Sequence, residues 1–213
     1  PWTIPSNLAI SLHPRLEYTF LERGGDVYMI AQELLGSFLT GVNWEESEIK
    51  VLGSAKGQDL ELLNTQHPLY NRKSPLILGE HVTTEAGTGE VHTAPGHGLE
   101  DYEVGVKYKL DILSPLNDKG IWTSEVPDLE GIPYYKGNAI IIERLEEKGA
   151  LLAKADISHS YPHCWRCKKP VIYRATPQWF VKVDKFRAET LEEIKKVKWI
   201  PASGETRISN MVE

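Results

Sequence analysis

The chain contains 213 residues, of which 41% are hydrophobic and 25% charged, and its formal net charge is −6 at pH 7. This length and composition are those of one globular domain with room for a small appendage. No apolar run approaches the roughly 18 residues of a membrane span, and the first residues lack the pattern of a secretion signal. The acidic balance argues against a protein that binds nucleic acid mainly through phosphate contacts, because such proteins are usually basic.

Short runs rich in strand-forming residues, separated by turn residues, dominate the first half of the chain. We expect strands at residues 8–12, 16–21, 27–31, 49–52, 76–78, 82–84 and 91–93. The sequence Arg-Gly-Gly-Asp at 23–26 favours a hairpin between the second and third of these strands. Residues 32–39 are typical of a short helix that ends at Gly41.

Helical spacing of apolar residues is clearer in the second half. Helices are expected at 99–110, 138–148 and 188–197, and late strands at 171–173 and 179–183. Together, the predicted strands and helices indicate an α+β domain with a β-barrel-like core, peripheral helices and a small appended cysteine knuckle. We divide it into a domain core at 1–155, a knuckle segment with returning strands at 156–183, and a helix and connector at 184–213. Both ends break off in mid-pattern, so we expect an insertion domain of a larger chain; an arbitrary boundary is the compatible alternative.

The densest cluster of polar residues lies in the glycine-rich stretch 87–102. Its glycines and Pro95 give sharp bends and let a ligand approach the main chain closely. His92 falls in a strand-like piece, and Asp101 falls in the first turn of the next helix, where the helix dipole favours a carboxylate. Either residue alone would be an ordinary loop histidine or a helix-capping acid, but the whole cluster favours a functional site.

The same stretch offers His92, His97 and Asp101 as ligands for a catalytic metal. Their spacing matches no standard metal signature, and Pro95 breaks the helical alignment between the histidines. A metal-dependent hydrolase therefore stays an alternative function, and a non-catalytic module that docks RNA is another.

Six segments carry a family resemblance. They are Pro-Trp-Thr-Ile-Pro-Ser-Asn at 1–7, the glycine-rich stretch at 87–102, and the segments 160–167, 174–180, 199–201 and 207–213. In this order they resemble the editing domain of isoleucyl-tRNA synthetases over nearly the whole chain. The His-Thr-Ala-Pro sequence and the Pro-Trp-Thr-Ile-Pro start fit the isoleucyl branch better than the related valyl and leucyl branches.

The resemblance implies a water-mediated, metal-independent deacylase that hydrolyses the ester of valyl-tRNA(Ile) as part of an isoleucine–tRNA ligase. Asp101 would bind the α-ammonium group of the misattached amino acid, and His92 would line its side-chain pocket. The other substrate-binding residues implied are Trp2, Thr3, Asn7, Gly87, Thr88, Gly89, Thr93 and His97. Neither a covalent nucleophile nor a cofactor is expected for editing. The expected partners are the valine-bearing acceptor end of the tRNA and the rest of the synthetase, in the cytoplasm. A threonine-rich run that the family carries just before Pro1 would also contribute to the site.

The only two cysteines, Cys164 and Cys167, have the spacing of half a four-cysteine zinc site. They form no disulfide framework, so a reducing compartment is expected. His159 and His163 are near enough in sequence to add a ligand, and the resemblance implies that the remaining ligands lie upstream in the parent. A structural zinc is therefore expected in the parent enzyme and not in this chain alone.

A small basic region lies near the end of the chain, at Lys195, Lys196, Lys198 and Arg207. Such a run is usually a solvated helix face, and contact with the tRNA acceptor end is the alternative.

Overall fold

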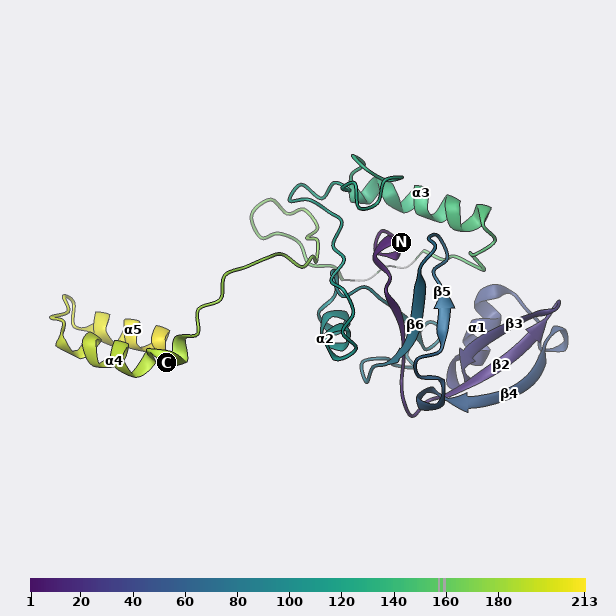
Figure 1. Ribbon diagram of the computed structural model, residues 1–213, viewed down its shortest axis with the longest axis horizontal. Coiled ribbons are helices and arrows are strands. Elements are labelled where there is room, and N and C mark those ends of the chain that lie inside the picture. The colour runs from purple at the N-terminus through teal and green to yellow at the C-terminus, as the bar shows by residue number, and fades with distance from the viewer. Residues whose placement is uncertain (157, 159) are drawn as a thin grey trace. The chain divides into compact units, whose positions relative to one another are not determined.

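The computed structural model describes residues 1–156, 158 and 160–213, which form two units, Pro1–Ala175 and Thr176–Glu213. The first unit holds all the strands and the helices α1 to α3 (Figure 1). Its strands are β1 Ala9–Leu12, β2 Glu17–Arg23, β3 Asp26–Ala31, β4 Lys50–Lys56, β5 Asn64–Gln66, β6 Lys73–Leu78 and β7 Glu90–Thr93. The α-helices are α1 Leu35–Val42, α2 Leu99–Lys107, α3 Tyr134–Glu147, α4 Arg187–Lys196 and α5 Ser203–Val212. Within the described residues, no helix combines the length and the apolar character that crossing a membrane requires.

A four-stranded sheet in the order β5-β6-β1-β7 lies at the centre of the first unit. Strand β1 pairs in parallel with β6 and antiparallel with β7, so that Ile10 lies opposite both Leu76 and His92. Strand β1 is buried over most of its length, as expected for a strand with neighbours on both sides. This pairing brings residues near 7, 74 and 92 together although they are far apart in sequence.

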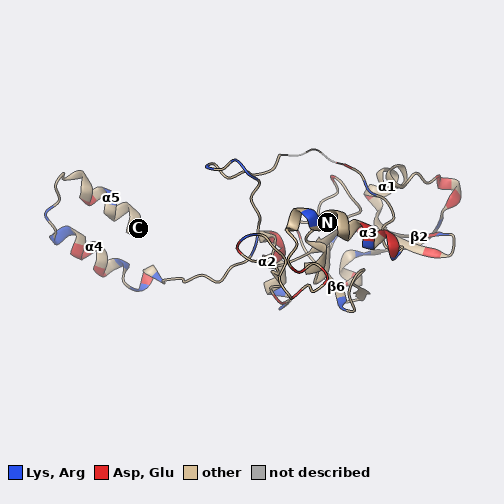
Figure 2. Ribbon diagram, turned by 90° about the horizontal axis from the view of Figure 1, so that it is seen from above, with Lys and Arg blue, Asp and Glu red and all other residues tan. Residues whose placement is uncertain are grey.

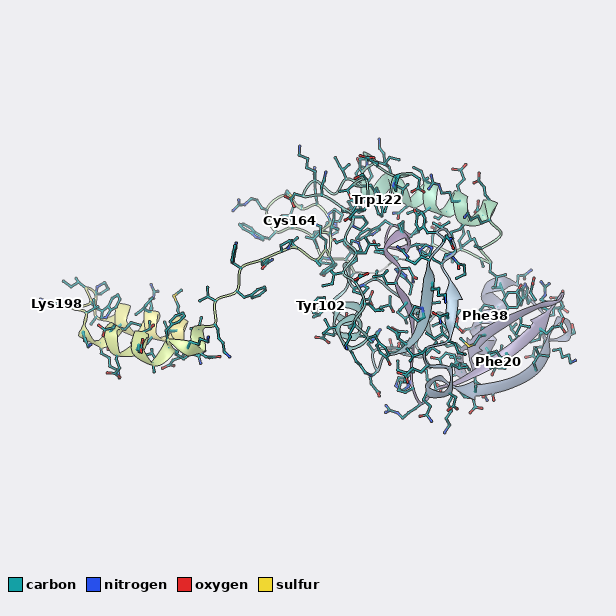
Figure 3. All side chains as sticks on the ribbon, viewed as in Figure 1. Phe20, Phe38, Tyr102, Trp122, Cys164 and Lys198 are labelled. Atoms are coloured by element: carbon teal, nitrogen blue, oxygen red, sulfur yellow. The ribbon has the colours of Figure 1, made fainter. Side chains whose placement is uncertain are left out.

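A second, three-stranded sheet has the order β3-β2-β4. The predicted hairpin is confirmed: β2 and β3 are joined through Gly24 and Gly25, whose positive φ values of 63° and 93° suit glycine. This sheet and β1 enclose a core of eight buried residues, Leu12, Tyr18, Leu21, Ile30, Ala31, Leu34, Leu60 and Leu76. In Figure 3, Phe20 and Phe38 mark this side of the unit, and both pack against the core.

Helix α3 covers the N-terminal segment and a second core. Ile141 and Leu145 pack with Trp122, which Figure 3 labels beneath this helix. Figure 1 shows the N-terminus beside α3, and the Trp2 backbone N–H donates to the Asn138 side-chain oxygen at 2.9 Å. The helix therefore anchors the start of the chain over the end of the central sheet.

The structure corrects several sequence expectations. The barrel was wrong: the described residues form two open sheets, because β5 and β7 are edges of one sheet and β3 and β4 of the other. Residues 82–84, 171–173 and 179–183 form no strand, and β5 and α5 were not predicted.

The expected helix at 32–39 begins as a 3-10 turn and continues as α1, which is capped by Asn43 and does not end at Gly41. Asn43 closes it because asparagine tolerates the left-handed conformation, here with φ of 56°. Helix α3 begins before residue 138, at Tyr134, because Pro133 in front of it ends the preceding extended segment. The three-part division at 155 and 183 stays a prediction.

The second unit is a pair of helices, α4 and α5. The Trp199 indole N–H donates to the Ile194 carbonyl at 3.0 Å, and Gly204 lies so close to the Trp199 ring that a Cβ would be 3.0 Å from it. Lys195 and Lys196 pair with acids three residues earlier, and Figure 2 shows basic and acidic residues interspersed along α4. The predicted basic region is thus partly neutralised on a solvated helix face, where such ion pairs contribute little stability.

Glu90, at the start of β7, has a buried Oε1 atom that finds no hydrogen-bond partner among the residues that the structure describes. Burial raises the pKa of this carboxyl from its ordinary value of 4.5 to about 8. Between these values the folded chain binds the proton more tightly than the unfolded chain does, so stability is lost as the pH rises. We expect Glu90→Gln, which cannot ionise, to raise the free energy of unfolding at pH 8 by on the order of 3 kcal/mol. At pH 4.5 the substitution should have little effect. Unfolding of both chains at the two pH values measures this, and an equal effect at both would contradict it.

Candidate functional site

The site begins with the N-terminal segment, in which Ile4–Ser6 form a 3-10 turn. The His67 ring N–H at Nε2 donates to the Ile4 carbonyl at 2.9 Å, and the Arg72 guanidinium donates to the Pro5 carbonyl at 2.6 Å. Backbone N–H groups of residues 69 and 70 donate to His67 Nδ1, which fixes its Nε2–H form. Two side chains of the loop before β6 therefore hold residues 4 and 5 in place.

His92, in the middle of β7, is held at both ring nitrogens. Its Nδ1 is 2.8 Å from the Asn7 side-chain nitrogen, and its Nε2 is 3.1 Å from the Thr3 hydroxyl oxygen. Burial lowers the pKa of His92 to about 4. The imidazole is thus neutral at pH 7 and is held by a hydrogen bond at each ring nitrogen.

His97 lies on the same side, after the bend that follows β7. Its Nδ1–H donates to the Tyr173 carbonyl at 3.0 Å, so its Nε2 accepts the Ser6 hydroxyl hydrogen at 3.1 Å. The Trp2 ring meets the His97 ring edge-on, with centroids 4.9 Å apart. The bend itself requires glycine at Gly96, where a Cβ would lie 2.1 Å from the Leu113 carbonyl oxygen.

Asp101 lies in the first turn of α2, as predicted. Its Oδ2 accepts the Ala94 backbone N–H at 2.8 Å, and among the described residues none donates to Oδ1. Burial raises the pKa of this half-buried carboxyl, and the backbone N–H of Ala94 opposes that shift. One oxygen is therefore fixed by the main chain and the other is free to accept from a cationic group. Tyr102 beside it is exposed (Figure 3).

The structure brings most of the predicted site residues together and separates others. Thr3, Asn7 and His92 form one hydrogen-bonded group, Trp2 and His97 meet edge-on, and Asp101 is tied to the segment after β7 through the Ala94 backbone. The Thr93 side chain is fully buried with Ser11 (Oγ to Oγ1, 2.7 Å), on the face of β7 opposite to His92.

The glycine turn at 87–89 contacts the second sheet instead. The Thr88 carbonyl accepts the Ala31 N–H, and the Gly89 carbonyl accepts the Tyr18 hydroxyl hydrogen. Gly89 packs on Ala31, where a Cβ would clash at 2.4 Å. A cavity of about 380 Å³ is lined by residues 15–17 and 31–33, and none of the networked residues lines it.

Metal ligation finds limited support in the geometry. Among the residues that the structure describes, no three His, Cys, Asp or Glu side chains lie close enough together to hold a metal ion. Both ring nitrogens of His92 and of His97 are already engaged in hydrogen bonds. A metal held by His92, His97 and Asp101 would therefore require these hydrogen bonds to break.

Cys164 and Cys167 lie in a tight turn, labelled at Cys164 in Figure 3. The Lys168 N–H donates to the Cys164 carbonyl at 2.8 Å, and N–H groups of Cys167 and Arg166 lower the pKa of the Cys164 thiol. Two thiols with such donors fit half of a tetrahedral zinc site. His163 donates from Nδ1 to the Tyr161 carbonyl, and His159 lies outside the described residues. The structural zinc of the parent stays a prediction.

Several residues that contact the site escaped the sequence analysis, namely Ser6, His67, Arg72 and Ser74, whose hydroxyl donates to Asn7 Oδ1 at 2.6 Å. Ser6 lies inside the segment 1–7 and could have been included on that ground. The other three have no local signal, because only the pairing of β6 with β1 brings them to residues 4–7.

Comparisons with known proteins agree with this architecture. A family model for class I tRNA synthetases (I, L, M and V) matches residues 26–213. The chain is 56% identical to an isoleucine–tRNA ligase of Brevibacillus brevis and 53% identical to one of Bacillus cytotoxicus. Each alignment covers 100% of this chain and 23% of the relative, so the chain spans about a quarter of the length of these relatives.

Two solved structures share the fold. GlLeuRS-CP1 aligns with a TM-score of 0.56 and 14% identity, over 74% of this chain and 80% of that one. The P. knowlesi cytosolic leucyl-tRNA synthetase editing domain aligns with a TM-score of 0.55 and 12% identity, over 70% and 79%. The resemblance seen in the sequence is thereby confirmed: the chain belongs to the class I tRNA synthetases of the I, L, M and V group and has the fold of an editing domain.

Proposed function

We propose that this chain edits tRNA within an isoleucine–tRNA ligase by hydrolysing the ester of valyl-tRNA(Ile). The observation that carries the proposal is that one short segment, from β7 to the first turn of α2, presents both a neutral His92 held at both ring nitrogens and Asp101, whose Oδ1 accepts from no described residue. A carboxylate with one free oxygen suits the α-ammonium group of an aminoacyl ester. The neutral His92 ring, held at both nitrogens, suits a wall that limits the size of the pocket for the amino-acid side chain.

The reaction needs a positioned water and donors for the developing oxyanion. Water attacks the ester carbonyl carbon, the bond to the ribose oxygen breaks, and that oxygen leaves with a proton as the free hydroxyl. The Asp101 contact would orient the ester, and orientation alone can contribute much of the rate enhancement. Hydroxyl and backbone N–H donors near the carbonyl would stabilise its charge. No step requires a covalent nucleophile, a cofactor or a metal.

The tRNA acceptor end and the rest of the synthetase are the proposed partners, and the cytoplasm is the proposed location. Because the chain carries a net charge of −6, most of the affinity for tRNA should come from the rest of the ligase. A metal-dependent hydrolase and a non-catalytic docking module are the alternatives, and the engaged ring nitrogens of both histidines disfavour the first.

The test compares ester loss from valyl-tRNA(Ile) and isoleucyl-tRNA(Ile) with the full-length ligase, with and without a chelator that spares the tRNA fold. We expect faster loss from the valyl ester, unchanged by the chelator. Loss of deacylation on chelation with amino-acid activation intact would select the metal-dependent alternative, whereas loss of both activities would indicate removal of the structural zinc predicted for the parent. Binding without turnover would select the docking module.

A further inference from the structure

Four side chains from three separate segments form one continuous hydrogen-bonded row. The Ser74 hydroxyl lies 2.6 Å from Asn7 Oδ1, Asn7 Nδ2 lies 2.8 Å from His92 Nδ1, and His92 Nε2 lies 3.1 Å from the Thr3 hydroxyl. Ser74 is in β6, His92 is in β7, and the other two precede β1, which lies between those strands. Ser74 is buried, and its hydroxyl reaches the predicted site through Asn7.

The direction of every bond in this row follows from one backbone carbonyl. Asn7 Nδ2 lies 2.9 Å from the Ala9 carbonyl oxygen, which can only accept, so the side-chain nitrogen must be on that side. Its second hydrogen then points to His92 Nδ1, which must accept. Asn7 Oδ1 in turn must accept from the Ser74 hydroxyl.

The far end of the row is determined in the same way. Since His92 Nδ1 accepts, the neutral ring carries its hydrogen on Nε2 and donates it to the Thr3 oxygen. Because the Thr3 oxygen accepts from His92, the Thr3 hydroxyl hydrogen takes no part in that bond. None of the described residues accepts this hydrogen. Thr3 is half-buried at the edge of the network, so this hydrogen is available to an acceptor oxygen of a ligand.

We propose that Ser74 is a positioning residue for editing: through Asn7 it holds His92 in the Nε2–H form and leaves the Thr3 hydroxyl as a donor to the substrate. The inference rests on the proposed function and extends it to a residue outside the pocket. Without the serine hydroxyl, the buried Asn7 Oδ1 loses its donor, and the Ala9 carbonyl alone then holds the amide in this orientation. The turned amide, which presents Oδ1 to His92 Nδ1, becomes populated, so His92 no longer has a single fixed partner. The row then ceases to specify which ring nitrogen bears the hydrogen.

The first measurement is the state of the His92 ring in the full-length ligase. Solid-state NMR of ligase labelled with ¹⁵N-histidine distinguishes the two neutral forms, and His92→Gln identifies the His92 signals by their loss. We expect one Nε2–H form in the wild type and a mixture of forms in Ser74→Ala. Ser74→Thr, which keeps the hydroxyl, should restore the single form.

The second measurement is the single-turnover rate of valyl-tRNA deacylation. Ser74→Ala should lower it roughly tenfold, the factor that loss of one neutral hydrogen bond represents. Thr65→Val is the matched control, because the Thr65 hydroxyl donates to the Ser74 backbone carbonyl at 2.6 Å and not to its side chain. Thr65→Val and Ser74→Thr should keep near wild-type rates. Ser74→Cys places a thiol, close in volume and a weak donor, at this position, so its rate should lie between those of the wild type and Ser74→Ala. This variant controls for a packing defect in Ser74→Ala.

A wild-type His92 spectrum in Ser74→Ala would overturn the proposal, as would equal rate losses in Ser74→Ala and Thr65→Val. Absence of deacylation by the wild-type ligase would instead overturn the proposed function, while the NMR comparison would still decide whether Ser74 controls His92. Amino-acid activation by each variant reports whether the ligase is intact.

Discussion

In the full-length ligase, Asp101→Ala should reduce deacylation of valyl-tRNA by about a hundredfold or more and leave amino-acid activation nearly unchanged. A charge-assisted hydrogen bond from the substrate ammonium contributes roughly 1.5–3 kcal/mol, and its loss would also misplace the ester relative to the attacking water. Single-turnover ester loss and pyrophosphate exchange measure the two activities.

Asp101→Asn separates this role from a structural one. The asparagine side-chain oxygen can still accept the Ala94 N–H, so the turn before α2 stays intact. It lacks the negative charge, so we expect deacylation to fall nearly as far as in Asp101→Ala. Wild-type deacylation by the asparagine variant would show that Asp101 supports the turn and does not bind the substrate ammonium.

His92→Ala should narrow the preference for valine over isoleucine in deacylation, by roughly ten- to a hundredfold. These two amino acids are the standard illustration of why editing is needed, since a synthetic pocket cannot strongly reject a side chain smaller by one methylene. An editing pocket has the opposite task, and any roomy apolar pocket would favour the larger isoleucine. Exclusion must therefore be steric. The two hydrogen bonds to Asn7 and Thr3 hold the His92 ring in place, so a wall formed by this ring, as we propose, would be costly to displace.

His92→Phe tests whether bulk or hydrogen bonding matters. Phenylalanine keeps the ring and loses both bonds, so it should preserve more of the valine preference than alanine even where the absolute rate falls. The quantity to compare is the ratio of the two single-turnover rates in each variant. An unchanged ratio in His92→Ala would place the wall elsewhere.

Local signals in the sequence were sufficient for several elements. The turn at Gly24 and Gly25 was predictable because its backbone conformation needs glycine, and α2 with Asp101 in its first turn followed from helical spacing. The motif at 87–102 indicated His92, His97 and Asp101 as site residues because these polar side chains are concentrated in one short stretch of sequence. Recognition of the family rested on the order of such stretches.

Other features were settled only by long-range pairing. The parallel pairing of β6 with β1 places Ser74 beside Asn7, and no periodicity within residues 73–78 predicts this pairing. The Thr93 hydroxyl bonds Ser11 of β1 on the face of β7 opposite to His92, and contacts with β2 and β3 tie the glycine turn at 87–89 to the second sheet. The barrel was wrong for a related reason, since strand sequences specify alternation of faces but not whether the edges meet. Residue chemistry and local conformation are properties of short segments, whereas the partners and the hydrogen-bond direction of a buried side chain depend on which strands lie next to it.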